Sequence, residues 1–255
     1  MSHLASSSLN NLTFSHGVDA SSSAEWPVLI PNGVLSHGTT VHTRRGQPLP
    51  LSIAGEETVF VVRMATLLFR LTLPGDLRQG VSLLYPGDVF RSAFVPPGGE
   101  ARLLALTPGE VLRFRFDAFS ELMAAAPAAR AYFDLAVARQ MARQAIHLAA
   151  IGQLDCFQRL VTFLMELALH TGAPASDGRV VFEMPLSRSE IAEYLGVNAD
   201  TLSRIMSRLR GEGLLIQPDR HTVYVSDLEA LAALSPASPA LMSLCGGAAP
   251  EPADL

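Results

Sequence analysis

The stretch from residue 186 to residue 216, LSRSEIAEYLGVNADTLSRIMSRLRGEGLLI, most constrains what this chain can fold into. Ser187 and Glu190 have the spacing of a capping box at the start of a helix. Gly196 supplies a sharp turn after that helix, and Asn198 or Asp200 can cap a second one. Two short helices joined by a glycine turn are therefore predicted here.

The second of these helices has one apolar and one polar face. The residues predicted to point inward repeat at helical spacing and are Leu202, Ile205, Met206 and Leu209. The residues predicted to point outward are Asp200, Thr201, Ser203, Arg204 and Arg208. Short polar side chains and an arginine near the start of a helix are what base readout in the major groove requires. The pattern predicts a DNA-binding helix-turn-helix, with an ordinary helical hairpin as the alternative.

Length and composition limit the other possibilities. The chain has 255 residues, enough for one large or two small domains. No apolar run approaches the roughly 20 residues of a membrane span, and the first residues lack the pattern of a signal peptide. Cys156 and Cys245 are far apart, which gives neither a disulfide framework nor a metal motif. We therefore expect a cytoplasmic protein without a membrane partner.

The net charge of −5 provides no global attraction to DNA. Even between residues 186 and 221 the basic and acidic side chains balance. The arginines there are Arg188, Arg204, Arg208, Arg210 and Arg220, and the acids are Glu190, Glu193, Asp200, Glu212 and Asp219. Affinity for DNA must then come from the placement of a few side chains and from doubling through a dimer.

The sequence pattern of the N-terminal half is typical of a β domain. Residues 1–28 are rich in Ser, Ala and Asn and predict a mobile arm. Residues 29–116 carry short apolar runs separated by turn residues, which is typical of a small antiparallel β-barrel or jelly roll. Pro74-Gly75-Asp76 and Pro86-Gly87-Asp88 are predicted hairpin turns.

Residues 117–152 are alanine-rich and predict a long helix, which begins properly at Pro127. An apolar stripe runs along it through Phe133, Val137, Met141, Ala145 and Leu148. Part of the stripe must cover the β domain. A helix of this length also suggests the same helix of a second copy as its partner, and a purely intramolecular role is the alternative.

Residues 153–234 read as a winged helix-turn-helix domain. A helix from Asp155 to His170 precedes the two short helices, and a two-stranded wing follows them. Arg220 at the wing tip can contact phosphate, and Ser187 and Arg188 at the start of the first short helix complete the predicted DNA-binding set. Residues 235–255 are rich in Pro and Ala and predict a flexible tail. The fold class is thus α+β.

The order of these parts resembles the CRP/FNR family of bacterial transcription regulators. The resemblance rests on HTRRGQPL, LLYPGDVF, GEVLRFRFDAFSELM, RQMARQ and the helix-turn-helix, and it covers roughly residues 30–232. It implies a cyclic-nucleotide-binding-like barrel as sensor, a long dimerisation helix, and a homodimer on a pseudo-palindromic operator. Activation through contact with RNA polymerase is implied as well.

The second helix resembles most closely the FNR and FixK branch, whose signature is Glu-x-x-Ser-Arg. By that match Arg204 pairs with a guanine, Ser203 contacts a thymine and Asp200 accepts a hydrogen bond from cytosine N4. The half-site of that branch resembles TTGAT. Asp200 departs from the signature because aspartate is one methylene shorter than glutamate, which puts the cytosine contact in doubt.

The resemblance does not identify an effector. Members that bind cyclic AMP carry an Arg-Ser pair where this chain has Gly99 and Glu100, so an acid stands near the phosphate position. Glu100, Arg102 and Gln144 are the candidate effector residues. An iron-sulfur cluster is excluded by the two cysteines, and haem would need His37, His42 or His147 as a ligand, though such single histidines are usually structural. We expect no cofactor, and a sensor that binds nothing, with control by protein abundance, is one possibility.

Two further alternatives stay open. Cys156 lies near the junction of the long helix and the DNA-binding domain, where oxidation could alter the dimer, although a small buried hydrophobe is the simpler interpretation. A cupin-type barrel enzyme would need three histidines and a carboxylate facing inward. His37 and His42 lack that spacing, and neither a phosphate loop nor a Ser-His-Asp set is present. The sequence therefore favours a regulator over an enzyme.

Overall fold

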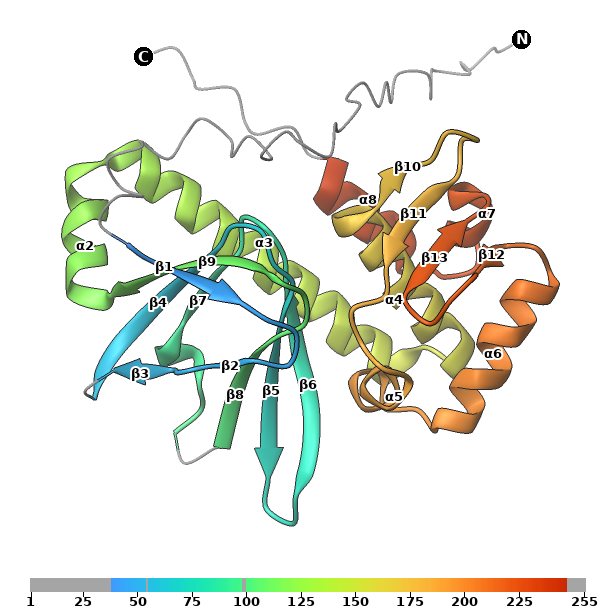
Figure 1. Ribbon diagram of the computed structural model, residues 1–255, viewed down its shortest axis with the longest axis horizontal. Helices are drawn as coiled ribbons and strands as arrows, with labels where there is room; N and C mark the ends of the chain where they lie inside the picture. The colour runs from blue at the N-terminus through green and yellow to red at the C-terminus, as the bar shows by residue number, and fades with distance from the viewer. Residues whose placement is uncertain (1–37, 54, 98–99, 247–255) are drawn as a thin grey trace, which may run out of the picture.

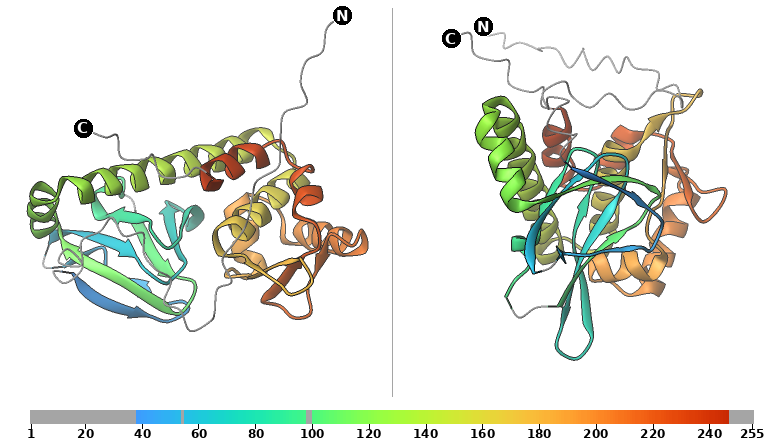
Figure 2. Two further views of the ribbon diagram at one scale, coloured as in Figure 1. Left: turned by 90° about the horizontal axis from the view of Figure 1, so that it is seen from above. Right: turned by 60° about the vertical axis from the view of Figure 1, so that its left-hand side comes forward.

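The computed structural model describes residues 38–53, 55–97 and 100–246. Figure 1 shows two lobes side by side, an N-terminal lobe of β-strands and a C-terminal lobe of helices with a small sheet. A long helix joins them and runs along one side of both lobes (Figure 2). The predicted arm at residues 1–28 lies outside the described residues. Within the described ranges no helix is both long and apolar enough to cross a bilayer.

The N-terminal lobe consists of two antiparallel sheets. The first has the order β1-β9-β4-β3, with β7 also paired to β4, and the second has the order β2-β8-β5-β6. The strands are β1 (Thr39–Thr43), β2 (Pro48–Leu49), β3 (Ser52–Ile53), β4 (Glu56–Val62), β5 (Leu67–Leu73), β6 (Leu77–Leu84), β7 (Val89–Arg91), β8 (Glu100–Ala105) and β9 (Gly109–Arg115). The predicted hairpin turn at Pro74-Gly75-Asp76 is confirmed, since it joins the paired strands β5 and β6. Pro86-Gly87-Asp88 is a turn but not a hairpin, because it joins β6 to β7, which belongs to the other sheet.

The sheets face each other across a shared core and are not closed into a barrel. Phe60 from β4 and Phe69 from β5 belong to one buried cluster, which includes side chains of both sheets. No ladder of hydrogen bonds links the two sheets in the described part of the chain. Barrel closure is therefore a wrong prediction, because β2 and β3 pair over only two residues each and leave open edges. The predicted antiparallel β architecture of this lobe is confirmed.

Two helices follow the sheets. The first is α2 (Phe116–Ala125), and the second is α3 (Pro127–Gln153), which has Pro127 in its first turn as predicted. Phe133 of α3 is buried against Val59 and Phe114 of the first sheet. Farther along, Met141 and Leu148 are 64% and 71% exposed. The predicted apolar stripe thus covers the β lobe with its first part and faces solvent with its second.

The C-terminal lobe is built around α4 (Cys156–Thr171), nine of whose side chains are buried. A sheet of β10 (Ala173–Pro174), β11 (Val180–Glu183), β13 (Thr222–Val225) and β12 (Leu215–Ile216) packs beside it, in that order. The helices α5 (Arg188–Leu195), α6 (Ala199–Gly211), α7 (Leu228–Ala232) and α8 (Ser238–Gly246) complete the lobe. The ends of β9 at Arg115, α3 at Gln153 and α7 at Ala232 lie next to the boundaries predicted at residues 116, 152 and 234.

The helix α8 replaces the first part of the predicted flexible tail. Leu241 is 1% exposed and joins the core of the C-terminal lobe, and α8 contacts both α3 and α4. Thr162 Oγ1 and Ser235 Oγ form a buried hydrogen bond of 2.7 Å just before this helix. The prediction was wrong for residues 235–246 because burial of Leu241 outweighs a composition that is poor in helix signals. The rest of the predicted tail lies outside the described residues.

Candidate nucleic-acid interface

The helix α5 begins with a complete capping box. Ser187 Oγ accepts a hydrogen bond from the Glu190 amide at 3.3 Å, and the Glu190 carboxylate accepts one from the Ser187 amide at 2.8 Å. The helix ends at Leu195 because Gly196 has a φ of 61°, a left-handed conformation that glycine adopts without a steric penalty. The predicted cap and turn are both confirmed.

The helix α6 begins at an asparagine cap. Asn198 Oδ1 accepts a hydrogen bond from the Asp200 amide at 2.8 Å, which selects Asn198 from the two predicted caps. The residues predicted to point inward do so: Leu202, Met206 and Leu209 are buried, and Ile205 is half-buried. Asp200 in the first turn and Arg208 in the last turn complement the helix dipole.

The helix α6 lies at the outer edge of the C-terminal lobe (Figure 1), and polar side chains on its other face are exposed. Asp200, Arg204 and Arg208 are exposed, whereas Thr201 and Ser203 are half-buried. Ser207 is exposed one turn beyond Ser203 on the same face. Ser207 was not among the residues predicted to point outward, although its four-residue spacing from Ser203 is the signal that places it on this face.

Arg204 differs from the neighbouring arginines in its contacts. Arg188 Nη1 donates to Ser203 Oγ at 3.0 Å, and Arg208 Nε donates to Glu212 at 2.8 Å. Arg208 also lies over the ring of Phe157, 4.7 Å from its centroid. The Arg204 side chain has no hydrogen bond or ion pair within residues 38–53, 55–97 and 100–246. Its five N–H groups are therefore available to an acceptor outside the chain.

The wing consists of β12 and β13, paired through Leu215–Val225 and Ile216–Tyr224. Asp219 Oδ1 fixes the turn between them by accepting hydrogen bonds from the amides of His221 and Thr222 at 2.7 and 2.8 Å. Arg220 is exposed at the tip of this ordered turn. A rigid tip with an exposed arginine suits a contact to a phosphate.

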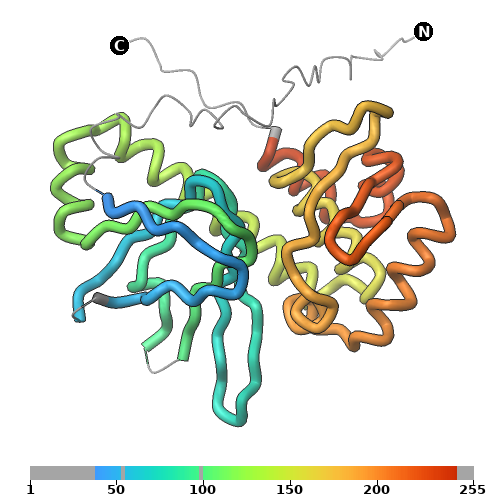
Figure 3. The backbone as a smooth tube through the Cα atoms, in the orientation of Figure 1, coloured from blue at the N-terminus to red at the C-terminus, as the bar shows by residue number. Residues whose placement is uncertain are grey.

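The β lobe holds α5 from the side away from this polar surface. Arg70 on β5 is 13% exposed, and its Nε lies 2.8 Å from Glu193 while its Nη2 lies 3.5 Å from Glu190. Gln79 Nε2 on β6 donates to the Tyr194 carbonyl at 3.2 Å. Figure 3 shows the β5–β6 hairpin on the side of the β lobe that faces the C-terminal lobe. Ser187 and Arg188 stay exposed in this arrangement.

The candidate effector residues do not form one site. Glu100 and Arg102 pair with each other at 3.0 Å on exposed β8, with 60% and 62% of their side chains exposed. Gln144 lies on α3 and lines a cavity of about 250 Å³ between α3 and the β lobe, with Phe69, Phe90 and Gln140 among its other lining residues. In the described part of the chain this lining contains no arginine or lysine that could neutralise a phosphate.

The candidate redox and haem residues are separated as well. Cys156 is a half-buried free thiol at the first residue of α4. His42 is exposed near Glu110, and His37 lies outside the described residues. His147 stacks on Tyr194 with 4.0 Å between ring centroids, and burial lowers its pKa to about 4. Within the described ranges no group of three or more His, Cys, Asp or Glu side chains could hold a metal ion.

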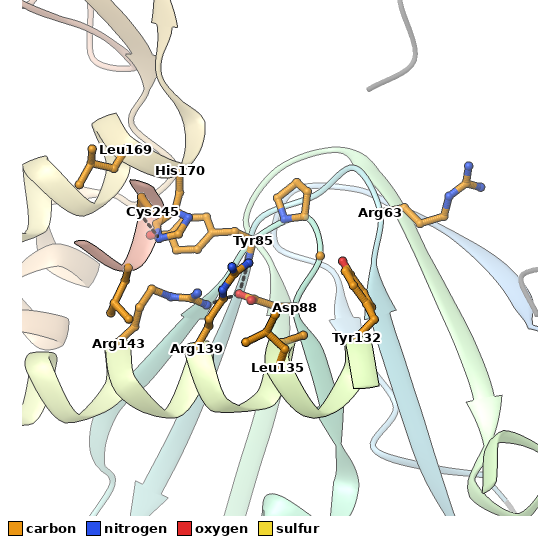
Figure 4. Close-up of a pocket in the computed structure, with 14 residues that line it drawn as sticks. Arg63, Tyr85, Asp88, Tyr132, Leu135, Arg139, Arg143, Leu169, His170 and Cys245 are labelled. Carbon is orange, nitrogen blue, oxygen red and sulfur yellow. Dashed lines mark hydrogen bonds and ion pairs between the residues drawn. The ribbon is translucent and has the colours of Figure 1, made fainter. Parts of the chain in front are cut away.

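A buried polar cluster that the sequence did not predict lies at the junction of the lobes (Figure 4). Asp88 forms an ion pair with Arg143, and the Tyr85 hydroxyl donates to Glu166 Oε1 at 3.2 Å. Burial raises the pKa of Glu166 to about 7, although Arg143 favours the carboxylate. Burial lowers the pKa of His170 to about 3, and Arg143 lowers it further. A glutamate amid eight buried neighbours on α4 is the only sequence signal of this cluster.

Comparison with known proteins agrees with this geometry. The family model of the Crp-like helix-turn-helix domain matches residues 158–234. The nitrogen fixation regulation protein FixK of Rhizobium meliloti (strain 1021) is 35% identical over 94 residues, which cover 37% of this chain and only 42% of that protein. The transcriptional regulatory protein btr of Bordetella pertussis is 27% identical over 192 residues, 75% of this chain and 78% of that protein.

Solved structures share the fold across both lobes. The structure of FixK2 from Bradyrhizobium japonicum has a TM-score of 0.65 at 21% identity and covers 78% of this chain and 97% of its own. A mutant of CooA from Carboxydothermus hydrogenoformans has a TM-score of 0.64 at 21% identity over 79% of this chain and 89% of its own. The relatives are transcription regulators and not enzymes, which confirms the choice of a regulator over a cupin-type enzyme. Residues 158–234 thus match the Crp-like helix-turn-helix domain, and over most of its length the chain is similar to bacterial transcription regulators, in agreement with the resemblance to the CRP/FNR family.

Proposed function

We propose that this protein is a homodimer that binds a pseudo-palindromic operator with TTGAT-like half-sites and activates transcription through RNA polymerase. The observation that carries the proposal is the exposed face of α6, on which Arg204 has no partner among the described residues. Because DNA is the proposed partner, we expect the protein in the cytoplasm. The proposal includes no resident cofactor.

Base recognition is assigned to three side chains of α6. Arg204 donates two hydrogen bonds to O6 and N7 of a guanine, Ser203 contacts the neighbouring thymine, and Asp200 accepts from cytosine N4. The hydrogen bond from Arg188 holds the Ser203 hydroxyl at the helix surface, which supports a common role for the two. The shorter reach of aspartate makes the cytosine the position at which this protein departs from TTGAT.

The remaining residues of the predicted interface are assigned to the DNA backbone. Ser187 and Arg188 lie at the start of α5, Arg208 near the end of α6 and Arg220 at the wing tip, all of them exposed. Thr201 is half-buried beside Asp200 and supports the start of α6. Contacts of this kind set the register of the protein on the duplex without reading its sequence.

The dimer is assigned to the exposed part of α3. Ala138, Met141, Ala145 and Leu148 are all exposed and are spaced by three, four and three residues. This is the spacing of a two-helix seam, and the two alanines let the helices approach closely. A symmetric pair presents α6 twice, which compensates for the net charge of −5.

Fluorescence anisotropy with a TTGAT-N4-ATCAA duplex and a scrambled duplex tests the proposal at fixed salt. We expect tight binding to the first duplex only. Arg204→Gln should cost about 1–3 kcal/mol per half-site against the guanine and relax the preference there. Arg220→Gln is the matched control, because loss of a phosphate contact weakens binding to both duplexes alike. Equal and weak binding of the unaltered protein to both duplexes would refute the assignment.

Activation is tested separately by transcription in vitro from a promoter that carries this operator upstream. We expect more transcript when protein and RNA polymerase are both present than with polymerase alone. A protein that binds the operator and lowers transcript at every operator position would be a repressor, and the activator part of the proposal would then be wrong.

A further inference from the structure

Ser207 lies on the polar face of α6, but the DNA contacts proposed above leave it without a role. Four side chains are spaced by three, one and three residues and therefore share this face: Asp200, Ser203, Arg204 and Ser207. Ser207 is exposed in the third turn of the helix. A side chain at this place would enter the same groove as its three neighbours.

An anchored arginine binds one side of the Ser207 hydroxyl. Arg210 Nη2 donates to Ser207 Oγ at 3.0 Å, and Arg210 Nη1 donates to Gln217 Oε1 at 2.9 Å. Gln217 is the first residue after β12, so Arg210 links the end of α6 to the base of the wing. Arg210 and Gln217 are both half-buried. This bridge therefore holds the Ser207 oxygen at the surface of the helix.

The bond from Arg210 determines which hydrogen bonds the Ser207 hydroxyl can still make. A serine hydroxyl has one O–H donor and two acceptor lone pairs. Because a guanidinium has no acceptor, Ser207 turns a lone pair toward Arg210 and keeps its O–H for another group. Within residues 38–53, 55–97 and 100–246 this O–H has no acceptor. Ser207 is therefore a donor, and the charged group on its oxygen strengthens it.

Ser203 has the same arrangement one turn earlier. Its Oγ accepts a hydrogen bond from Arg188 Nη1 at 3.0 Å, and its O–H has no acceptor in the described part of the chain. Arg204 lies between the two serines and has only donors. From Ser203 to Ser207 this face of α6 thus presents donors, whereas Asp200 at its start presents an acceptor.

Donors in the major groove distinguish cytosine from the other bases. Guanine, adenine and thymine each carry an acceptor there, whereas cytosine presents only its N4 donor. Four residues of helix rise about 6 Å, which is close to two base-pair steps of about 3.4 Å. Ser207 therefore reaches a base pair other than that of the thymine assigned to Ser203.

We infer that Ser207 is a further specificity-determining residue, which donates a hydrogen bond to a guanine, adenine or thymine at a base pair that its three neighbours on α6 do not read. Arg210 is its positioning residue. The inference rests on the proposed function, because it needs α6 in the major groove of DNA. It predicts that cytosine is the least favoured base at this position on the contacted strand.

Selection from a library of randomised duplexes first gives the site that the full-chain protein prefers. Each base pair of that site and of its flanks is then replaced by the other three in both half-sites, and fluorescence anisotropy measures binding at fixed salt. We expect one position, distinct from the guanine that Arg204 reads, at which the duplex with cytosine binds weakest. Ser207→Ala should weaken binding to the preferred duplex about fivefold per half-site and abolish the preference at that position alone, as expected for one hydrogen bond.

Two further variants separate base reading from a structural effect. Arg210→Met leaves the Ser207 oxygen able to accept from cytosine N4, so discrimination against cytosine should fall whatever happens to the overall affinity. Ser176→Ala changes an exposed serine between β10 and β11 and is the control, which should leave every base preference unchanged. Because Ser207 is exposed and alanine favours helix, Ser207→Ala should fold.

The outcomes separate this inference from the proposed function. If the protein selects no sequence, both fail. If it selects one and Ser207→Ala keeps every base preference, or weakens binding to all duplexes alike as loss of a phosphate contact would, only the inference fails. Undiminished discrimination against cytosine in Arg210→Met would refute the role of Arg210.

Discussion

At the scale of single residues, the least usual environment is that of Glu166. Its carboxyl is buried on α4, accepts a hydrogen bond from Tyr85 and has a pKa raised from 4.5 to about 7 by desolvation. Between pH 4.5 and about pH 7, Glu166 is protonated in the folded protein and ionised in the unfolded chain. The free energy of unfolding therefore falls as pH rises through this window.

Glu166→Gln should remove that fall, because an amide keeps an acceptor for Tyr85 and cannot ionise. Relative to the unaltered protein, we expect the variant to gain on the order of 1–3 kcal/mol in going from pH 5 to pH 8. Denaturant unfolding at several pH values measures this difference. His147 and His170, whose lowered pKa values destabilise the fold as pH drops below 6.5, are present in both proteins and cancel. Glu121→Gln on the exposed part of α2 is the control, and an equal pH dependence of both variants would contradict the assignment.

At the scale of elements, the contact between the β5–β6 hairpin and α5 sets how the lobes meet. The strands slip in register between Phe69 and Arg70, so that Arg70 is opposite Gly80. A Cβ on Gly80 would lie 2.8 Å from Cδ2 of Tyr194, a buried ring of α5. Gly80 is thus required for close approach, and Arg70 and Gln79 then reach α5.

Gly80→Val should push the hairpin away from α5 and lower the free energy of unfolding by about 1–3 kcal/mol through overpacking. Hydrogen exchange should rise in α5 and β6 more than in α2. Gly152→Ala is the matched control, since its Cβ would meet nothing within 4 Å. That change should stabilise α3 by up to about 1 kcal/mol. Equal exchange in α5 for both variants would show that the hairpin does not hold the helix.

At the scale of the whole molecule, α3 runs past both lobes (Figure 2). Its exposed Met141 and Leu148 are the basis of the proposed dimer. We expect Leu148→Asp to give a folded monomer in sedimentation velocity and to reduce operator affinity strongly. Leu77→Asp is the control, because Leu77 is 64% exposed at the tip of the β5–β6 hairpin. A dimeric Leu148→Asp protein would place the interface elsewhere.

The sequence was most informative where the determinants are local. The caps at Ser187 and Asn198, the turn at Gly196 and the helix start at Pro127 each depend on neighbours within a few residues. Features that depend on distant residues were not predictable. The cluster of Asp88, Arg143 and Glu166 joins three separate elements, and the open edges of the sheets depend on which strands pair.

The contacts of individual arginines were likewise not predictable from the sequence, because they depend on the fold. Arg188, Arg204 and Arg208 look alike in the sequence, and only the fold gives Arg188 a serine and Arg208 a glutamate. The helix α8 formed against expectation for a related reason, since the surface that buries Leu241 is made by α3 and α4.

The length of α3 has a mechanical consequence. Its 27 residues span about 40 Å, so a tilt of about 10° at one end displaces the other by about 7 Å, roughly two base-pair steps. If two copies pair along α3, the distance between the two half-sites that they bind on DNA depends on the tilt of this helix. The affinity for operators whose spacers are one base pair shorter or longer would then indicate the tilt of α3 in the bound dimer.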